Sequence, residues 1–211
     1  MQSCLADRIQ HLSIVLGVLL ASGGARAAHY TWAGNASYSQ WNITHLIWWD
    51  GSTGVVWPNG TTDNAVFSNS SSQKNVSVAN GILVGNMTFT DTGYLLTGGK
   101  IYSYGNITVS GSSYTATIRA YMTRTGNMIK DGNGTLVLEP TGGNNTIYTL
   151  SAAGGTVIHS GGTTNTGEPG KERTGVDTKN GALLKVTGGT LSAPFRTING
   201  NGSAGTLTVE G

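Results

Sequence analysis

The acidic residues are the first candidates for chemistry, because clustered carboxylates, with calcium or a nearby Lys or Arg, could cleave a polysaccharide. They are scattered singly along the chain, and no two recur at a repeat-length offset within an apolar frame. Asp91 and Asp131 come nearest to a pair, but both stand in Gly-containing turn phrases, where Asp hydrogen-bonds its own backbone. Residues 131–134 (Asp-Gly-Asn-Gly) resemble part of a calcium loop without its further oxygen ligands. We therefore expect no catalytic residue, no cofactor and no metal site.

Metal-ligating and nucleophilic side chains are equally sparse. His29, His45 and His159 never come at the spacing of a two-histidine ligand. No serine stands in a Gly-x-Ser-x-Gly elbow. The single cysteine, Cys4, precedes an apolar run that we interpret as a secretion signal, so the mature chain is expected to carry no thiol.

Tryptophan is the residue type that most invites a binding hypothesis. All five tryptophans lie within residues 28–69, and Trp48, Trp49 and the nearby Trp57 could form a platform on which a sugar ring stacks. The alternative is that these tryptophans pack in the core. Core packing is favourable because a buried aromatic side chain removes about 150–250 Å² of surface from water. A repetitive fold must cover its exposed end. We therefore favour a packed cap and keep glycan stacking as the alternative.

The elements that must position these residues are short strands. Glycine pairs alternate with β-branched runs such as 107–109 (Ile-Thr-Val) and 135–138 (Thr-Leu-Val-Leu). Outside the signal, no window shows helical periodicity. Three short strands per turn would give a repeat of roughly 20 residues. The sequence predicts an all-β solenoid held by backbone ladders and stacked side chains.

The chain divides into three expected parts. Residues 1–27 read as a signal peptide, with cleavage after Ala27 at the Ala25-Arg26-Ala27 site. Residues 28–73 form a Trp-rich cap, and residues 74–211 form β-helix repeats with a polar loop excursion at 165–179. Because Gly205–Gly211 ends in mid-pattern, we expect a piece of a longer gene product.

Charge narrows the range of partners. Cleavage removes Asp7, Arg8 and Arg26, so the 12 basic and 10 acidic residues become ten and nine. A near-neutral chain with 10% charged residues is not expected to bind nucleic acid or an anionic membrane.

The order of motifs resembles the autotransporter-associated β-strand repeat proteins of bacteria. Residues 30–34 (Tyr-Thr-Trp-Ala-Gly), Trp41, 57–60 (Trp-Pro-Asn-Gly) and 64–68 are similar to the opening of that family. Residues 126–138 resemble its Leu-x-Lys-x-Gly-x-Gly-Thr-Leu-x-Leu repeat, with the apolar residue displaced by one. The phrase that usually follows is only weakly matched at residues 145–150.

The resemblance implies a right-handed parallel β-helix and export through the inner membrane, to the cell surface, the outer membrane or the extracellular space. It also implies a translocator barrel in a longer gene product. This sequence departs from the family pattern there, because it lacks the many amphipathic strands of about ten residues that such a barrel needs.

The functional expectation is a structural or adhesive surface stalk without catalysis, and its partner would be a glycan or another host or cell-surface component. A carbohydrate-binding module using Trp48 and Trp49 is the first alternative. A β-helix polysaccharide lyase or hydrolase is the second. The oligomeric state stays open.

Overall fold

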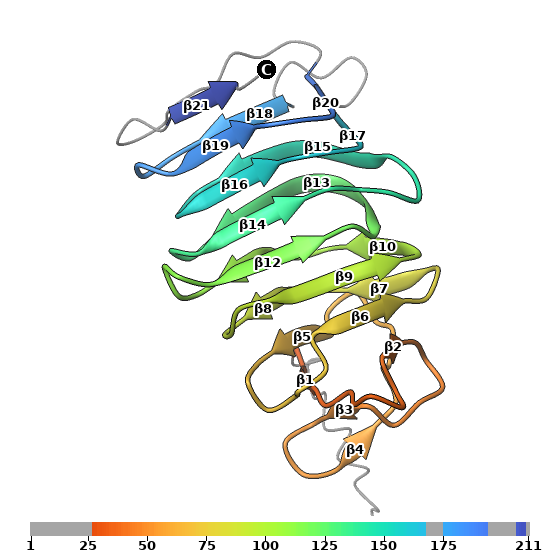
Figure 1. Cartoon of the computed structure of the whole chain (residues 1–211). Helices are drawn as coiled ribbons and strands as arrows, with labels where there is room; N and C mark the ends of the chain where they lie inside the picture. The colour runs from red at the N-terminus through yellow and green to blue at the C-terminus, as the bar shows by residue number, and fades with distance from the viewer. Residues whose placement is uncertain (1–26, 168–174, 194–205, 210–211) are drawn as a thin grey trace, which may run out of the picture.

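The computed structural model describes residues 27–167, 175–193 and 206–209, and these contain strands but no helix. The strands wind into a stack of turns (Figure 1). Pairing between successive turns is parallel, so the predicted all-β parallel solenoid is confirmed.

Two sheets form the walls of the solenoid. The eight-stranded sheet contains β2 (Gln40–Trp41), β6 (Asn75–Val78), β9 (Tyr94–Gly98), β12 (Thr115–Ile118), β14 (Thr135–Leu138), β16 (Thr156–His159), β19 (Leu183–Val186) and β21 (Thr206–Val209). The 13-stranded sheet contains β1 (His29–Trp32), β3 (Trp48–Trp49), β4 (Gly54–Val55), β5 (Asn64–Phe67), β7 (Ile82–Val84), β8 (Met87–Phe89), β10 (Lys100–Ser103), β11 (Ile107–Val109), β13 (Tyr121–Asp131), β15 (Asn145–Ala152), β17 (Thr163–Thr166), β18 (Gly175–Thr178) and β20 (Thr190–Ser192).

Each turn contributes three strand segments. β6, β7 and β8 make one turn, and β9, β10 and β11 make the next. In the third turn the long strand β13 supplies two segments, since its first residues pair with β10 and its last residues pair with β11. β15 does the same, pairing first with β17 and then with β18. The two long strands therefore join two walls into one sheet.

The register sets the length of a turn. Leu95 lies opposite Thr117, Thr117 opposite Val137, and Val137 opposite Ile158, so these turns take 22, 20 and 21 residues. This confirms the predicted repeat of roughly 20 residues. Ile158 lies opposite Lys185, 27 residues later, in the turn that contains the predicted excursion.

Inward-facing residues stack in columns because the parallel ladder holds equivalent positions above one another. Side chains alternate between buried and partly exposed along β9, β12 and β14. One column runs through Val76, Leu96, Ile118 and Leu138, all fully buried. Burial of such apolar columns, together with the ladder hydrogen bonds, stabilises the solenoid.

Glycine makes the corners that these turns require. Gly155 and Gly162 adopt φ of 59° and 68°, in the left-handed region. A Cβ at Gly162 would lie 2.0 Å from the carbonyl oxygen of Pro140 in the turn below. The corners therefore need glycine for both its conformation and its close approach to the neighbouring turn.

A lysine occupies one of the apolar columns. Lys130 follows Ile107 in the column and is fully buried. Its ammonium group donates hydrogen bonds to the carbonyls of Gly132 and Gly154, both at 2.7 Å, and to that of Gly134. Burial lowers the pKa of Lys130 to about 8, so the group is still mainly cationic at neutral pH. Through these hydrogen bonds, the buried Lys130 ammonium group links two successive corners of the solenoid.

A histidine follows Leu138 in the column that begins at Val76, and Val186 lies opposite it in the next turn. His159 is fully buried, and its Nδ1 lies 3.0 Å from the carbonyl of Gly188. That carbonyl requires the proton on Nδ1, so Nε2 accepts from the Thr164 hydroxyl at 3.0 Å. Asn145 Nδ2 in turn donates to this hydroxyl at 3.1 Å. The interior thus carries a satisfied polar chain that crosses from one wall to another.

Strands occupy both ends of the range 165–179, where the sequence predicts an excursion. Residues 165 and 166 belong to β17, and 175–178 form β18, whose Val176 is buried opposite Leu150. Residues 168–174 and the predicted signal segment before Ala27 lie outside the described residues.

The three carbonyl contacts of Lys130 lead to a test of the corner clamp. Lys130→Met would remove the side-chain donor from the Gly132 and Gly154 carbonyls, at about 1–3 kcal/mol for each. The Gly134 carbonyl would keep its hydrogen bond from the Thr156 backbone N–H at 3.1 Å. We expect the free energy of unfolding to fall by about 3 kcal/mol in urea titrations. Lys179→Met is the matched control, because Lys179 forms a surface ion pair with Asp177 at 3.2 Å. Such a pair contributes about 0–1 kcal/mol, so equal effects of the two variants would contradict the clamp.

Candidate functional site

The N-terminal end of the solenoid holds a cluster of aromatic rings. β1 pairs in parallel with β5 but antiparallel with β3, which in turn pairs antiparallel with β4. This reversal brings together four tryptophans and a phenylalanine whose ring centroids lie 4.6–6.5 Å from their neighbours: Trp32, Trp41, Trp48, Trp57 and Phe67. All five side chains are at most 1% exposed. They fill the end of the interior.

The cluster continues into the apolar columns. The rings of Phe67 and Phe89 stack at 4.7 Å with an angle of 11° between their planes. The indole of Trp32 donates to the carbonyl of Gln73 at 2.8 Å, and that of Trp57 donates to the carbonyl of Leu83 at 2.9 Å. These bonds join the aromatic end to the first turn.

The three tryptophans considered for sugar stacking do not share one surface. Trp48 and Trp57 are 0% and 1% exposed, while Trp49, beside Trp48 on β3, is 45% exposed. Alternation along the strand places the adjacent side chains on opposite faces. Stacking requires an exposed ring, so Trp49 is the one residue of this set that a sugar could contact.

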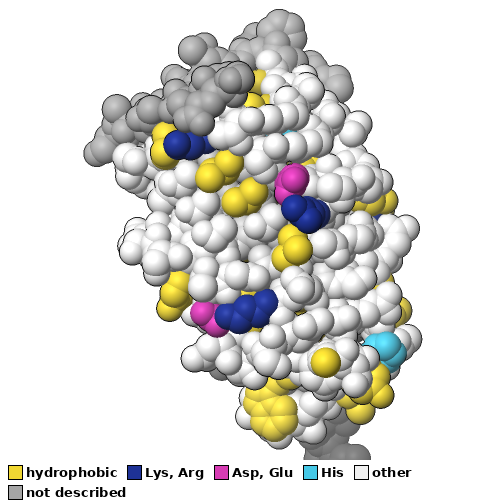
Figure 2. Space-filling model, viewed as in Figure 1, with side chains coloured by type: hydrophobic (Ala, Val, Ile, Leu, Met, Phe, Trp, Pro, Cys, Tyr) yellow, Lys and Arg dark blue, Asp and Glu magenta, His cyan; other side chains and the backbone are white. Residues whose placement is uncertain are grey.

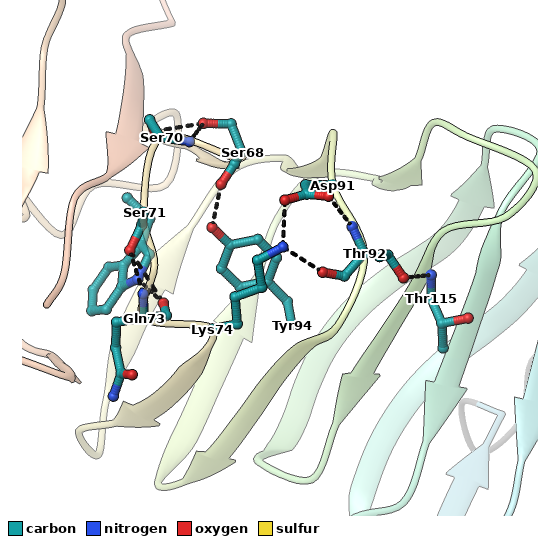
Figure 3. A network of polar contacts seen from close by, with 10 residues as sticks. Ser68, Ser70, Ser71, Gln73, Lys74, Asp91, Thr92, Tyr94 and Thr115 are labelled. Carbon is teal, nitrogen blue, oxygen red and sulfur yellow. Dashed lines mark hydrogen bonds and ion pairs between the residues drawn. The ribbon is translucent and has the colours of Figure 1, made fainter. Parts of the chain in front are cut away.

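A polar network ties the cap to the first turns (Figure 3). Lys74 Nζ binds the carboxylate of Asp91 and donates to the carbonyl of Thr92 at 2.8 Å. The same ammonium lies 5.5 Å from the ring centroid of Tyr94, whose hydroxyl donates to the carbonyl of Ser68 at 2.5 Å. The network thereby connects the segments around Ser68, Lys74, Asp91 and Tyr94.

Two groups in this network have shifted acidities. The hydrogen bond from Lys74 holds the pKa of Asp91 below its ordinary value. Burial raises the pKa of Tyr94 to about 12, with a smaller contribution from the Asp91 charge. The arrangement is a static clamp: it stabilises a carboxylate and a neutral phenol, and the described residues around it offer neither an activated nucleophile nor a base.

Exposed apolar side chains surround the aromatic end (Figure 2). They comprise Tyr38, Ile43, Leu46, Trp49 and Val56, with Leu46 the most exposed at 71%. Two of these residues, Tyr38 and Leu46, line a hollow of about 310 Å³ together with Thr44, His45 and Ile47.

The loop beside this hollow is ordered by a side chain. Asn42 accepts hydrogen bonds at 3.0 Å and 2.9 Å from the backbone N–H groups of Thr44 and His45. Its amide nitrogen lies 3.0 Å from His45 Nδ1, which places the imidazole proton on Nε2. The ring of Tyr38 packs edge-on against His45 at 5.3 Å. The sequence analysis missed this hollow, whose signal was an Asn-x-Thr-His loop among exposed apolar residues.

The acidic residues are paired one by one and do not converge. As predicted, Asp91 and Asp131 each accept a hydrogen bond from the next backbone N–H, at 2.8 Å and 2.7 Å. Backbone hydrogen bonds from Thr53 and Ser52 lower the pKa of Asp50. The remaining described carboxylates have their own partners, with Asp63 on the Gly60 N–H, Glu139 on Arg119 and Asp177 on Lys179. Glu168, Glu172 and Glu210 lie outside the described residues.

Two kinds of feature are absent from the described parts of the chain. No three His, Cys, Asp or Glu side chains come together there in an arrangement that could hold a metal ion. Those parts also contain no helix long and apolar enough to cross a membrane.

Comparison with known proteins gives one informative match. The chain is 30% identical over 158 residues to the adhesin BmaC autotransporter of Brucella suis biovar 1 (strain 1330). The match takes in 69% of this chain and 4% of that much longer protein. No family model matches the sequence, and no solved structure matches it. The similarity and the parallel β-solenoid are consistent with an autotransporter passenger-like protein, as the sequence motifs predicted.

The burial of the tryptophans predicts opposite outcomes for adjacent residues. Trp48→Ala should lower the free energy of unfolding by about 3–5 kcal/mol, because it empties the centre of the aromatic cluster. Trp49→Ala should change it by less than about 1 kcal/mol, since the ring is half exposed. Thermal and urea unfolding would measure both, and a larger loss for Trp49→Ala would refute this packing.

The raised pKa of Tyr94 predicts alkaline sensitivity. The folded-state pKa of about 12 exceeds the ordinary value of 10.0. The neutral Tyr94 phenol therefore contributes its full stabilisation of the fold below pH 10.0, and this contribution is lost as pH rises through 12. Tyr94→Phe should have a lower free energy of unfolding than the unsubstituted chain at neutral pH. Across this alkaline range, that free energy should fall less in the variant than in the unsubstituted chain. Urea titrations at several pH values would show it. Tyr104→Phe is the control, because the Tyr104 side chain is 48% exposed. Its free energy of unfolding should match that of the unsubstituted chain at each pH.

Proposed function

We propose that this chain is a segment of an exported bacterial surface adhesin, in which the β-solenoid holds binding surfaces away from the cell. The match to an autotransporter adhesin over 158 residues carries the proposal. The chain would act at the cell surface, associated with the outer membrane or released outside the cell.

The architecture suits such a role. Parallel ladders link successive turns, and one apolar column runs along the stack without a break from Val76 to Leu138. A stack of this kind is stabilised by contacts between neighbouring turns, so it can be lengthened by adding turns. Its side walls leave outward-facing residues free to contact a partner.

The surface chemistry favours contact with an uncharged or weakly charged partner. Figure 2 shows a face that is mostly uncharged, with basic and acidic side chains next to one another. Lys74 with Asp91 and Arg119 with Glu139 are such pairs, and they cancel one another's charge. The proposed partners are therefore a glycan or another component of a host or cell surface.

An enzymatic role receives less support. Hydrolysis or elimination on a polysaccharide needs carboxylates that act together on one bond. In the described residues each carboxylate is bound by its own backbone or basic partner, and those pairs lie on different turns.

Adhesion of coated beads tests the proposal. Latex beads carrying the purified chain should adhere to epithelial cells more than albumin-coated beads, because many copies on one bead strengthen weak contacts. Soluble chain should compete, and beads whose coat has been unfolded before mixing should not adhere. Adherence equal to that of albumin-coated beads would refute the adhesive role.

A further inference from the structure

Arg124 has no carboxylate partner within the described residues. Arg124, in β13, extends towards the preceding turn, where Nη1 donates to the carbonyls of Gly105 at 2.6 Å and Ser103 at 3.4 Å. Its Nε is buried without a hydrogen-bond partner, and Nη2 makes no hydrogen bond within the described residues. Elsewhere in the described residues, ion pairs with carboxylates are formed by Lys74, Arg119 and Lys179.

Burial makes this unpaired charge costly. Desolvation by burial lowers the pKa of the Arg124 guanidinium. A guanidinium keeps its charge even so, and two carbonyls satisfy only part of its five N–H donors. A partly desolvated cation of this kind is stabilised by an anion that reaches its free N–H groups.

A hollow lies beside the guanidinium where the strand register shifts. Arg124 pairs with Ile147 and Asn127 pairs with Thr149, so Thr125 and Gly126 together face Tyr148. This two-against-one arrangement is a β-bulge, which bends the strand and re-aims its side chains. The resulting hollow has a volume of about 220 Å³ and is lined by Ser103, Tyr104, Arg124, Thr125 and Gly126.

Glycine at position 126 keeps the space open. A Cβ placed there would lie 3.9 Å from Arg124 Nε, an ordinary contact distance, and Gly126 is not among the positive-φ glycines. A side chain is therefore sterically and conformationally acceptable at this position. A branched one would fill the space beside Nε while leaving Arg124 in place.

The lining selects the chemistry of a ligand. A carboxylate matches the fork of a guanidinium and would supply the missing anion. Tyr104 is 48% exposed and presents an aromatic face that suits a sugar ring, while the exposed Thr125 adds a hydroxyl. The volume of about 220 Å³ is below the roughly 300–1,000 Å³ of drug-sized sites, so it suits one ring.

We propose that this hollow binds a single carboxylated sugar, a uronic or sialic acid at the end or branch of a glycan. Arg124 holds the carboxylate, and Tyr104 contacts the ring. The ring face and the hydroxyl favour a sugar over an acidic peptide, which needs neither. The inference rests on the proposed adhesive function and specifies the class of its ligand.

Calorimetric titration of the full chain with glucuronic acid and sialyllactose tests this site. Both should bind, and the methyl ester of glucuronic acid and lactose should bind about tenfold more weakly or worse, because they lack the charge. Arg124→Gln should weaken binding of the acids to a similar extent. Gly126→Val should do the same while retaining the guanidinium and its hydrogen bonds to the preceding turn.

Arg119→Gln is the matched control, since Arg119 already pairs with Glu139 at 2.9 Å and should not affect binding. Far-UV circular dichroism would verify that each variant is folded. Equal binding of acidic and neutral sugars, binding unchanged in folded Arg124→Gln and Gly126→Val, or tighter binding of an oligoglutamate peptide would each overturn the proposal.

The bead assay separates the two proposals. Adherence that persists with folded Arg124→Gln and Gly126→Val chains, which fail to bind acidic sugars, would overturn the adhesive use of this site and leave the adhesive function intact. Acidic sugar binding in solution without adherence of beads carrying the unsubstituted chain would overturn the adhesive function and leave the sugar site intact.

Discussion

The register of the parallel ladder is the constraint on which the rest of the structure depends. Backbone hydrogen bonds fix each residue above its equivalent in the neighbouring turn, as Leu95, Thr117, Val137 and Ile158 show. A shift by one residue would turn every inward side chain outward. Because the register is fixed, apolar side chains of successive turns contact one another in columns. Each contact contributes little to stability, but together the columns form a continuous core. The cap and the surface hollows are built against this frame.

The ladder also explains how polar residues can stand inside. At each corner the chain leaves the regular sheet, and its carbonyls need donors from elsewhere. Lys130 provides three hydrogen bonds to corner carbonyls, and His159 binds that of Gly188. A polar side chain in a column is therefore stable where it reaches a corner. Indole nitrogens of Trp41 and Trp48 lack such partners and are held by ring packing alone.

The candidate binding features lie where the regular pattern is interrupted. The reversal from parallel to antiparallel pairing at β1, β3 and β4 stops the stack and leaves Trp49 exposed beside the buried Trp48. The bulge in β13 leaves Arg124 without a counter-ion next to a small hollow. Regular turns offer flat walls of alternating side chains, whereas each interruption presents side chains at angles that a flat wall does not allow. The irregular positions of this solenoid are therefore where its candidate sites are found.

The sequence by itself determined the strands, the turn of roughly 20 residues and the inward columns, because β-branched runs and glycine corners recur along the chain and each depends on nearby residues. It also predicted that Asp91 and Asp131 bind the neighbouring backbone, although Asp131 is the last residue of β13 and does not lie in a turn. Only the tertiary structure decided which tryptophans are buried, where Lys130 and His159 find their partners, and that Arg124 lies by a hollow. Those outcomes depend on residues about one turn away, such as Gly105 and Gly154, or on the reversal of strand direction at β3. Neither local propensity nor spacing specifies which turn supplies a partner, because that is fixed by the register between turns.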